Sequence, residues 1–279
     1  MDEKIKEIIK RALEEDIGSE DITTEAIIPP GATVHGKIVV KGKGVIAGLV
    51  VAKEVFWQID NEALFEQLFN EGDKVQKGDV VATVSGNARS ILMAERTAIN
   101  FLQRMSSIAT TTRQYVDAVV HTKAKILDTR KTAPGLRLTD KMAVKMGGGQ
   151  NHRIGLYDMF LIKDNDIAVV GSINKAVSLC KRYREEKKQK FLIEVEADTL
   201  AQVKEAVESG VDRIMLDNFS VSHMRKAVEL INGRTKIEAS GGITLENVKE
   251  VAETRVDYIS VGALTHSVKA LDISVDITL

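Results

Sequence analysis

The chain has 279 residues, enough to bury a substantial core in one large domain or two unequal ones. Its 39 basic and 40 acidic residues give a net charge of −1, which argues against a nucleic-acid-binding protein, and no apolar run approaches membrane-spanning length. The single cysteine, Cys180, excludes an intramolecular disulfide framework. Together with a charged N-terminus that does not resemble a signal peptide, it leads us to expect a cytoplasmic protein.

The first part of the chain mixes helices with short strands. Apolar residues at helical spacing predict a helix over residues 5–13 that stops near Gly18. Strand-like runs follow at 33–40, 45–51 and 80–84. Biotinyl and lipoyl carrier domains have similar spacing, but the later hairpin lacks the exposed lysine that carriers modify, which disfavours that interpretation. A helical region at 89–120 comes next, and its Ser-Ser pair is a candidate break between two helices.

From residue 125 onward the pattern alternates between strands and helices. Six β-rich runs are predicted, at 124–127, 159–162, 191–195, 213–216, 236–239 and 258–261. This alternation predicts a parallel α/β fold, either a barrel or a doubly wound sheet. Polar residues or glycine follow or end every run: Asp128, Lys163, Glu196, Asp217, Ser240 and Gly262. Six such strand ends favour a barrel, where they meet at one mouth, and fewer than eight strands make it incomplete.

Cationic residues concentrate between residues 127 and 165, in a segment that Pro134-Gly135 and Gly147-Gly148-Gly149 break into loops. The segment contains Arg130, Lys131, Arg137, His152, Arg153 and Lys163. Guanidinium groups suit bidentate capture of carboxylates and phosphates, so the cluster predicts a pocket for a small, highly anionic substrate. We interpret His152 as a hydrogen-bond donor to that substrate, the alternative being a loop histidine satisfied by the backbone.

Two further features involve strand ends. Glu196 and Asp217 follow adjacent predicted strands and suit a hard divalent cation such as Mg²⁺, although an ion pair with Lys163 is the structural alternative. Glycines follow the last two strands, in Ser240-Gly241-Gly242 and at Gly262. Glycine frees backbone N–H groups to face an anion, and a following helix N-terminus adds partial positive charge, so these turns predict a phosphate site.

These segments, taken in order, resemble those of the quinolinate phosphoribosyltransferase family, also called nicotinate-nucleotide pyrophosphorylase (carboxylating). The strings that carry the resemblance are Asp128-Thr129-Arg130-Lys131-Thr132-x-Pro134-Gly135, Asn151-His152-Arg153, Lys163-Asp164-Asn165, Glu194-Val195-Glu196, Leu216-Asp217-Asn218-Phe219 and Glu238-Ala239-Ser240-Gly241-Gly242-Ile243. The resemblance implies a type II phosphoribosyltransferase fold. Residues 1–110 would form an N-terminal α/β sandwich joined by a C-terminal strand at 270–279, and residues 111–269 would form an incomplete α/β barrel.

The resemblance also implies a transferase of NAD biosynthesis. Quinolinate and phosphoribosyl pyrophosphate would give nicotinate mononucleotide, pyrophosphate and CO₂. By the family pattern, quinolinate is held by Arg130, His152, Arg153, Lys163 and, from the neighbouring subunit of a homodimer, Arg96. Lys131 would contact the sugar phosphate and pyrophosphate, while Glu196 and Asp217 would position Mg²⁺ and the ribose hydroxyls. The 5′-phosphate would lie on Ser240, Gly241, Gly242 and Gly262.

Two departures from the family pattern stand out: Ser107 where glycine is frequent, and Asp166 where histidine is frequent. Asp166 adds negative charge beside the cationic segment and bears on substrate preference. Two other functions therefore remain open. One is a related transferase for another heterocyclic acid, such as nicotinate without decarboxylation, or the molybdenum-associated relative. The other is a non-catalytic anion-binding protein, which Glu196 and Asp217 together with the full cationic set disfavour.

Overall fold

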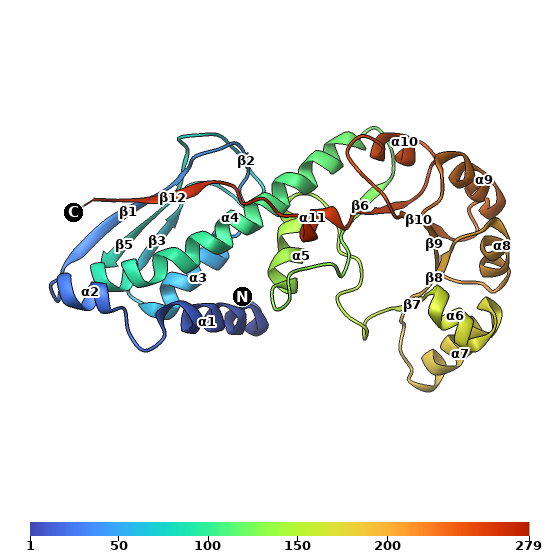
Figure 1. The fold of residues 1–279 in the computed structure, drawn as a ribbon, viewed down its shortest axis with the longest axis horizontal. Helices are drawn as coiled ribbons and strands as arrows, with labels where there is room; N and C mark the ends of the chain where they lie inside the picture. The colour runs from blue at the N-terminus through green and yellow to red at the C-terminus, as the bar shows by residue number, and fades with distance from the viewer. Residues whose placement is uncertain (279) are drawn as a thin grey trace. The chain divides into compact units, whose positions relative to one another are not determined.

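The structure, a computed structural model, describes residues 1–278, which form two compact units (Figure 1). The first unit comprises Met1–Arg113, Thr132–Gly148 and residues 264–278, and the second comprises Gln114–Lys131 and Gly149–Ala263. Residues 132–148 thus belong with the first unit, although the sequence had placed them in the barrel range. The final residue of the strand expected at 270–279 lies outside the described residues.

The first unit contains a four-stranded antiparallel sheet in the order β12-β1-β5-β3. Its strands are β1 (Thr33–Val40), β3 (Leu64–Gln67), β5 (Val80–Asn87) and β12 (Ile273–Thr278). Alternate side chains of β1 (Val34, Ile38 and Val40) are buried, as the period of a strand with one covered face requires. The C-terminal β12 pairs with β1, so the two ends of the chain share one sheet. Two short strands, β2 (Gly44–Val45) and β4 (Lys74–Val75), form a separate pair.

Six helices accompany these strands: α1 (Glu3–Ile17), α2 (Ile22–Ile27), α3 (Leu49–Ile59), α4 (Ala88–Ala118), α5 (Arg137–Met146) and α11 (Ala263–His266). The opening helix is confirmed, with Gly18 at its C-cap. The strand expected at 45–51 is wrong, because β2 ends at Val45 and α3 begins at Leu49. The backbone N–H groups of Gly48 and Val50 donate to the Glu71 carboxylate at 2.8 and 3.0 Å. This carboxylate, distant in sequence, accepts hydrogen bonds from backbone amides that have no partner within the helix. The helix start is thereby stabilised against the strand preference of the β-branched residues.

The long helix α4 is continuous, so the break expected at Ser106 and Ser107 is also wrong. The Ser106 hydroxyl accepts from Ala47 N at 3.0 Å and donates to Ala47 O at 3.2 Å, and the Ser107 hydroxyl donates to Lys269 O. These hydroxyls bond to other segments of the first unit instead of competing with the helix backbone. The family glycine position is therefore occupied here by a serine with a defined partner.

The second unit is built on six parallel strands in the order β6-β11-β10-β9-β8-β7. They are β6 (Lys125–Leu127), β7 (Phe160–Ile162), β8 (Ile193–Ala197), β9 (Arg213–Asp217), β10 (Lys236–Ser240) and β11 (Tyr258–Ser260). Five helices accompany them: α6 (Asp164–Val170), α7 (Ile173–Glu186), α8 (Leu200–Glu208), α9 (Val221–Ile231) and α10 (Val248–Ala252). All six predicted strands are present.

This strand order confirms the incomplete barrel. Each strand lies beside its successor from β7 to β11, and β6 then pairs with β11, so that β6 and β7 form the two open edges. Helices α8 and α9 lie outside β8 and β9 (Figure 1). A doubly wound sheet would reverse its order at an internal switch point, which this sheet does not do.

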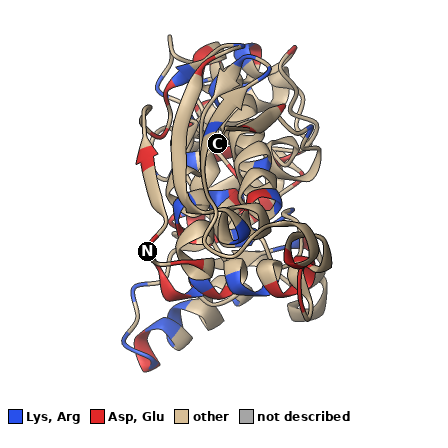
Figure 2. Ribbon diagram, turned by 90° about the vertical axis from the view of Figure 1, so that its left-hand side faces the viewer, with Lys and Arg blue, Asp and Glu red and all other residues tan. Residues whose placement is uncertain are grey.

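Lys and Arg alternate with Asp and Glu along the ribbon, as the net charge of −1 suggests (Figure 2). On α1, Lys6 pairs with Glu3 at 2.8 Å and Arg11 with Glu7 at 2.9 Å, on an exposed face. Among residues 1–278, no helix combines the length and apolar character needed to cross a membrane.

Candidate active site

The parallel strands bring three predicted site residues to one rim of the barrel. Glu196 is the second-last residue of β8. In the β9–β10 register Asp217 pairs with Ser240, and each of the two is the last residue of its strand. The rim is thus lined by two carboxylates followed by a hydroxyl and a glycine turn. Parallel barrels place their chemistry at this rim, because their variable loops start there.

Arg130 and Arg153 form the cationic part of the site. Arg153 is 9% exposed, and its Nη1 donates to the carbonyl of Met159 at 3.4 Å. Burial, followed by repulsion from the nearby Arg130 guanidinium, lowers the pKa of Arg153 below its ordinary value. Arg130 is half-buried, and two guanidinium groups held near each other are stabilised by an anion that contacts both.

Lys163 directly precedes α6 and pairs with Glu196, its Nζ lying 2.5 Å from Oε2. This is the ion pair considered as the alternative to a metal site, and in it the charge of Glu196 is balanced by Lys163. The Asp166 carboxylate accepts from Lys163 N at 2.9 Å and begins α6. Asp166 therefore has a local structural function in addition to its charge.

Asp217 accepts a hydrogen bond from the side-chain amide of the next residue, Asn218, at 2.7 Å. Asp217 and Glu196 are half-buried carboxylates on neighbouring strands, and hard divalent cations prefer such oxygen ligands. The donor set therefore fits Mg²⁺, which typically takes one or two protein carboxylates and completes its shell with water and substrate phosphates.

The turn after β10 has the backbone expected of a phosphate site. Gly241 and Gly242 adopt φ values of +86° and +61°, a region that L-residues with side chains rarely enter. The Asn247 side chain closes the turn by accepting from Thr244 N and donating to Gly242 O, both at 2.9 Å. The helix N-terminus expected at this turn is wrong, because α10 begins only at Val248 and has 5 residues, whereas α11 begins at Ala263, directly after Gly262. The amides of the turn are therefore the groups that could face an anion here.

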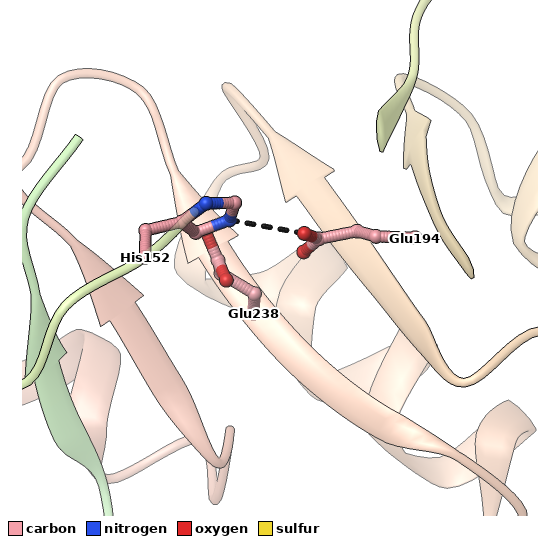
Figure 3. A group of neighbouring side chains, drawn as sticks. All are labelled: His152, Glu194 and Glu238. Carbon is pink, nitrogen blue, oxygen red and sulfur yellow. Dashed lines mark ion pairs between the residues drawn. The ribbon is translucent and has the colours of Figure 1, made fainter. Parts of the chain in front are cut away.

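His152 points into the barrel interior, toward Glu194 and Glu238 (Figure 3). Its Nε2 lies 3.0 Å from Glu194 Oε2 and 3.4 Å from Glu238 Oε1, while its Nδ1 accepts from Arg153 N at 2.8 Å. Asp128 accepts from the backbone N–H of His152 at 2.9 Å. Both ring nitrogens thus face protein groups. The ring holds the backbone of Arg153 through the hydrogen bond at Nδ1, an arrangement that sequence analysis did not predict.

Two more residues complete this buried cluster. Arg213 Nη1 lies 2.8 Å from Glu238 Oε2, and the Ser260 hydroxyl donates to the other oxygen of Glu238. Burial raises the pKa of Glu238, but His152, Ser260 and Arg213 outweigh burial and hold that pKa below its ordinary value. Burial, followed by repulsion from Glu238, raises the pKa of Glu194 to about 7.

The cluster therefore retains one additional proton. Burial lowers the pKa of His152, but the hydrogen bonds and charges of Glu194 and Glu238 outweigh burial and raise it to about 9. The amide contact at Nδ1 opposes a doubly protonated ring, since an N–H cannot accept another N–H. Geometry decides between these two effects, and we assign the additional proton to Glu194. The ligand atoms of His152, Glu194 and Glu238 lie within 4.8 Å of one another, and in this structure the ring pairs with both carboxylates.

Glu194 and Glu238 belong to the strings that carry the family resemblance, but sequence analysis predicted no function for them. The available signal was their two-residue spacing from Glu196 and Ser240, which places each pair on the same face of a strand. Of the other predicted residues, Lys131 is exposed in the loop after β6, and Gly262 is half-buried just after β11. Arg96 is exposed on α4 in the first unit.

Comparison with known proteins covers nearly the whole chain. The model of the quinolinate phosphoribosyl transferase N-terminal domain matches residues 21–106, and that of the C-terminal domain matches residues 108–276. Quinolinate phosphoribosyltransferase [decarboxylating] 2b, mitochondrial, from Nicotiana tabacum is 47% identical over 98% of this chain and 82% of its own length. The probable nicotinate-nucleotide pyrophosphorylase [carboxylating] of Bacillus subtilis is 44% identical over 99% of this chain and 94% of its own length.

Solved structures agree with these relatives. The structure of NadC from Streptococcus pyogenes has a TM-score of 0.93 and 43% identity, covering 99% of this chain and 96% of that one. Human nicotinic acid phosphoribosyltransferase, at 12% identity and a TM-score of 0.61, shares the fold alone. The resemblance drawn from the strand-end motifs is thereby confirmed, and the chain belongs to the quinolinate phosphoribosyltransferase family.

Proposed function

We propose that this chain transfers a phosphoribosyl group from phosphoribosyl pyrophosphate to quinolinate and releases pyrophosphate and CO₂, forming nicotinate mononucleotide for NAD biosynthesis. The observation that carries the proposal is the pairing of two cationic side chains, Arg130 and Arg153, with two carboxylates, Glu196 and Asp217, in one barrel. The first pair suits a pyridine dicarboxylate, and the second suits a ribose and its metal-bound pyrophosphate. Both substrates follow from membership of the family.

Quinolinate recognition would depend on Arg130 and Arg153, aided by Lys163. Each guanidinium presents two parallel N–H donors to a carboxylate, and the anion relieves the repulsion between the arginines. Lys163 is paired with Glu196 in the structure. It would exchange this partner for a quinolinate carboxylate, which frees Glu196 for the sugar.

We assign His152 a supporting function in place of direct quinolinate binding. Its ring accepts the Arg153 amide and faces two buried glutamates, so it fixes the backbone that carries Arg153. Correct placement of a binding group within about an ångström has a large effect on reaction rate. A change at His152 should therefore weaken quinolinate binding through Arg153.

Glu196 and Asp217 would bind the ribose hydroxyls and support the positive charge that develops on the sugar as pyrophosphate departs. Lys131 would contact the leaving pyrophosphate and sugar phosphate. The turn at Ser240, Gly241 and Gly242, with Gly262 on the neighbouring strand, would hold the 5′-phosphate. A bound Mg²⁺ would neutralise charge on the pyrophosphate.

We further propose a homodimer, or a larger oligomer built from dimers, in which Arg96 of one subunit completes the quinolinate site of the other. Exposure of Arg96 on α4 supports this assignment, because an exposed arginine in the first unit is available to a second chain. A cytoplasmic location is also a proposal, supported by the single half-buried cysteine, Cys180, a residue suited to a reducing compartment.

The test is incubation with phosphoribosyl pyrophosphate, Mg²⁺ and either quinolinate or nicotinate, with nicotinate mononucleotide as the measured product. We expect product from quinolinate. Product from nicotinate but not from quinolinate would identify a related transferase that does not decarboxylate. Quinolinate binding by calorimetry without any product would identify a non-catalytic anion-binding protein.

A further inference from the structure

One residue at the rim has an unusual backbone and no function assigned so far. Asn218 follows Asp217 at the end of β9 and adopts φ +55°, in the left-handed region. Asparagine tolerates this region better than most residues, and glycine adopts it most easily. Conformation alone permits either residue, so the contacts of the Asn218 side chain are what point to a function.

The side chain and backbone of Asn218 connect two strand ends. Its amide donates to Asp217 Oδ2 at 2.7 Å, and its backbone N–H donates to Ser240 O at 2.9 Å. Its carboxamide also packs against Gly241: a Cβ placed on Gly241 would lie 2.7 Å from Asn218 Cγ and 2.9 Å from Asn218 N. Any side chain at position 241 would therefore displace Asn218.

We propose that Asn218 is a positioning residue that fixes the Asp217 carboxylate relative to the turn at Ser240 and Gly241. Asp217 is assigned to the ribose hydroxyls and the turn to the 5′-phosphate, so Asn218 would match the site to the ribose-phosphate part of phosphoribosyl pyrophosphate. This inference rests on the proposed function. It predicts that Asn218 affects one substrate and leaves the other unchanged, since quinolinate is assigned to Arg130 and Arg153.

Asn232 provides a matched control within the same unit. It is also a left-handed asparagine, with φ +46°, and it forms the C-cap of α9, where its N–H donates to Val228 O at 3.0 Å. Replacement of either asparagine by glycine preserves the backbone conformation. Only Asn218→Gly removes a contact with Asp217.

The experiment compares Asn218→Gly, Asn218→Asp and Asn232→Gly by steady-state kinetics, calorimetry and thermal unfolding. For Asn218→Gly we expect KM for phosphoribosyl pyrophosphate to rise about tenfold, the loss typical of one hydrogen bond to a charged group. The quinolinate dissociation constant and Tm should stay at wild-type values. Asn218→Asp should be worse, because it places a carboxylate against Asp217. Asn232→Gly should match the wild type in all three measurements.

A double-mutant cycle gives the second measurement. If Asn218 acts through Asp217, the losses of phosphoribosyl pyrophosphate affinity in Asn218→Gly and Asp217→Asn, measured by calorimetry, should not add. Wild-type kinetics for Asn218→Gly, equal effects on both substrates or additive losses would each overturn the proposal. Absence of product from the wild-type protein would instead contradict the proposed function itself.

Discussion

At the residue scale, the site combines a pair of neighbouring arginines with buried carboxylates. Burial, followed by repulsion from Arg130, lowers the pKa of Arg153, and this arrangement suits an anionic ligand. The rim residues were predictable because each follows a strand, and strand ends of a barrel converge. The cluster around His152 was not predictable, since Glu194, Glu238 and Arg213 come from three strands whose pairing no local pattern states.

A test of the arginine pair is Arg130→Lys, which keeps the charge but loses the planar fork. We expect quinolinate affinity to fall by about 1.5–3 kcal/mol, since an ammonium cannot reproduce two parallel hydrogen bonds. Calorimetry with quinolinate measures the loss. Arg182→Lys on the exposed face of α7 is the control and should bind normally. Normal binding by Arg130→Lys would mean that Arg130 acts only through long-range charge.

The buried cluster predicts how stability depends on pH. Folding raises the pKa of Glu194 from 4.5 to about 7, so the folded carboxyl holds a proton that the unfolded chain releases. The stabilisation is fully present below about pH 4.5 and is lost as pH rises through about 7. One proton limits the slope to about 1.4 kcal/mol per pH unit.

Chemical denaturation of Glu194→Gln over this pH range measures the effect. The variant should lose most of the slope, because one buried carboxylate and its proton are gone. Glu208→Gln on the exposed face of α8 is the control and should keep the wild-type slope. An unchanged slope in Glu194→Gln would assign the pH dependence to other groups.

At the scale of elements, local pattern predicted the barrel strands well and the start of α3 poorly. The barrel strands are short, apolar and flanked by helices, so their local sequence agrees with their final state. Residues 45–51 favour a strand locally, yet Glu71 satisfies the amides of Gly48 and Val50 and starts a helix. The hydroxyls of Ser106 and Ser107 likewise bond to distant residues, Ala47 and Lys269. Local sequence does not show these partners, so it did not predict that α4 continues through the pair.

Glu71→Ala tests this account of α3. Removal of the carboxylate leaves two amides of a partly buried helix start without their acceptor, which should lower the free energy of unfolding by about 1–3 kcal/mol. Urea denaturation measures the change. Glu62→Ala, at an exposed position of the same unit, should have little effect. Equal stability of the two variants would show that the amides of Gly48 and Val50 find other acceptors.

At the scale of the whole molecule, the proposed function assigns Arg96 to the site of a second subunit. It lies in the first unit, whereas Arg130, Arg153 and Lys163 lie in the second. The sequence implied a shared site only through the family resemblance, because neither composition nor periodicity shows which chain completes a site. The shared site of the proposed homodimer therefore calls for a test with two different variants.

Mixing Arg96→Ala with Lys131→Ala provides that test. Each variant alone should be inactive, whereas mixed dimers contain one site with both residues intact. At equal mixing about half the dimers are mixed, so recovered activity should approach about a quarter of the wild-type value, provided that subunits exchange. Exchange is verified by mass spectrometry of differently tagged chains. Verified exchange without recovered activity would place Arg96 outside the partner's site.

The most direct test of the central claim is the stoichiometry of the reaction. Quinolinate labelled with ¹⁴C in the carboxylate next to the ring nitrogen is incubated with the protein, phosphoribosyl pyrophosphate and Mg²⁺, and nicotinate mononucleotide, pyrophosphate and labelled CO₂ are quantified together. The account predicts that all three form in equal amounts and that Glu196→Ala combined with Asp217→Ala abolishes all three while quinolinate still binds. Nucleotide that retains the label, or CO₂ released without nucleotide, would contradict it.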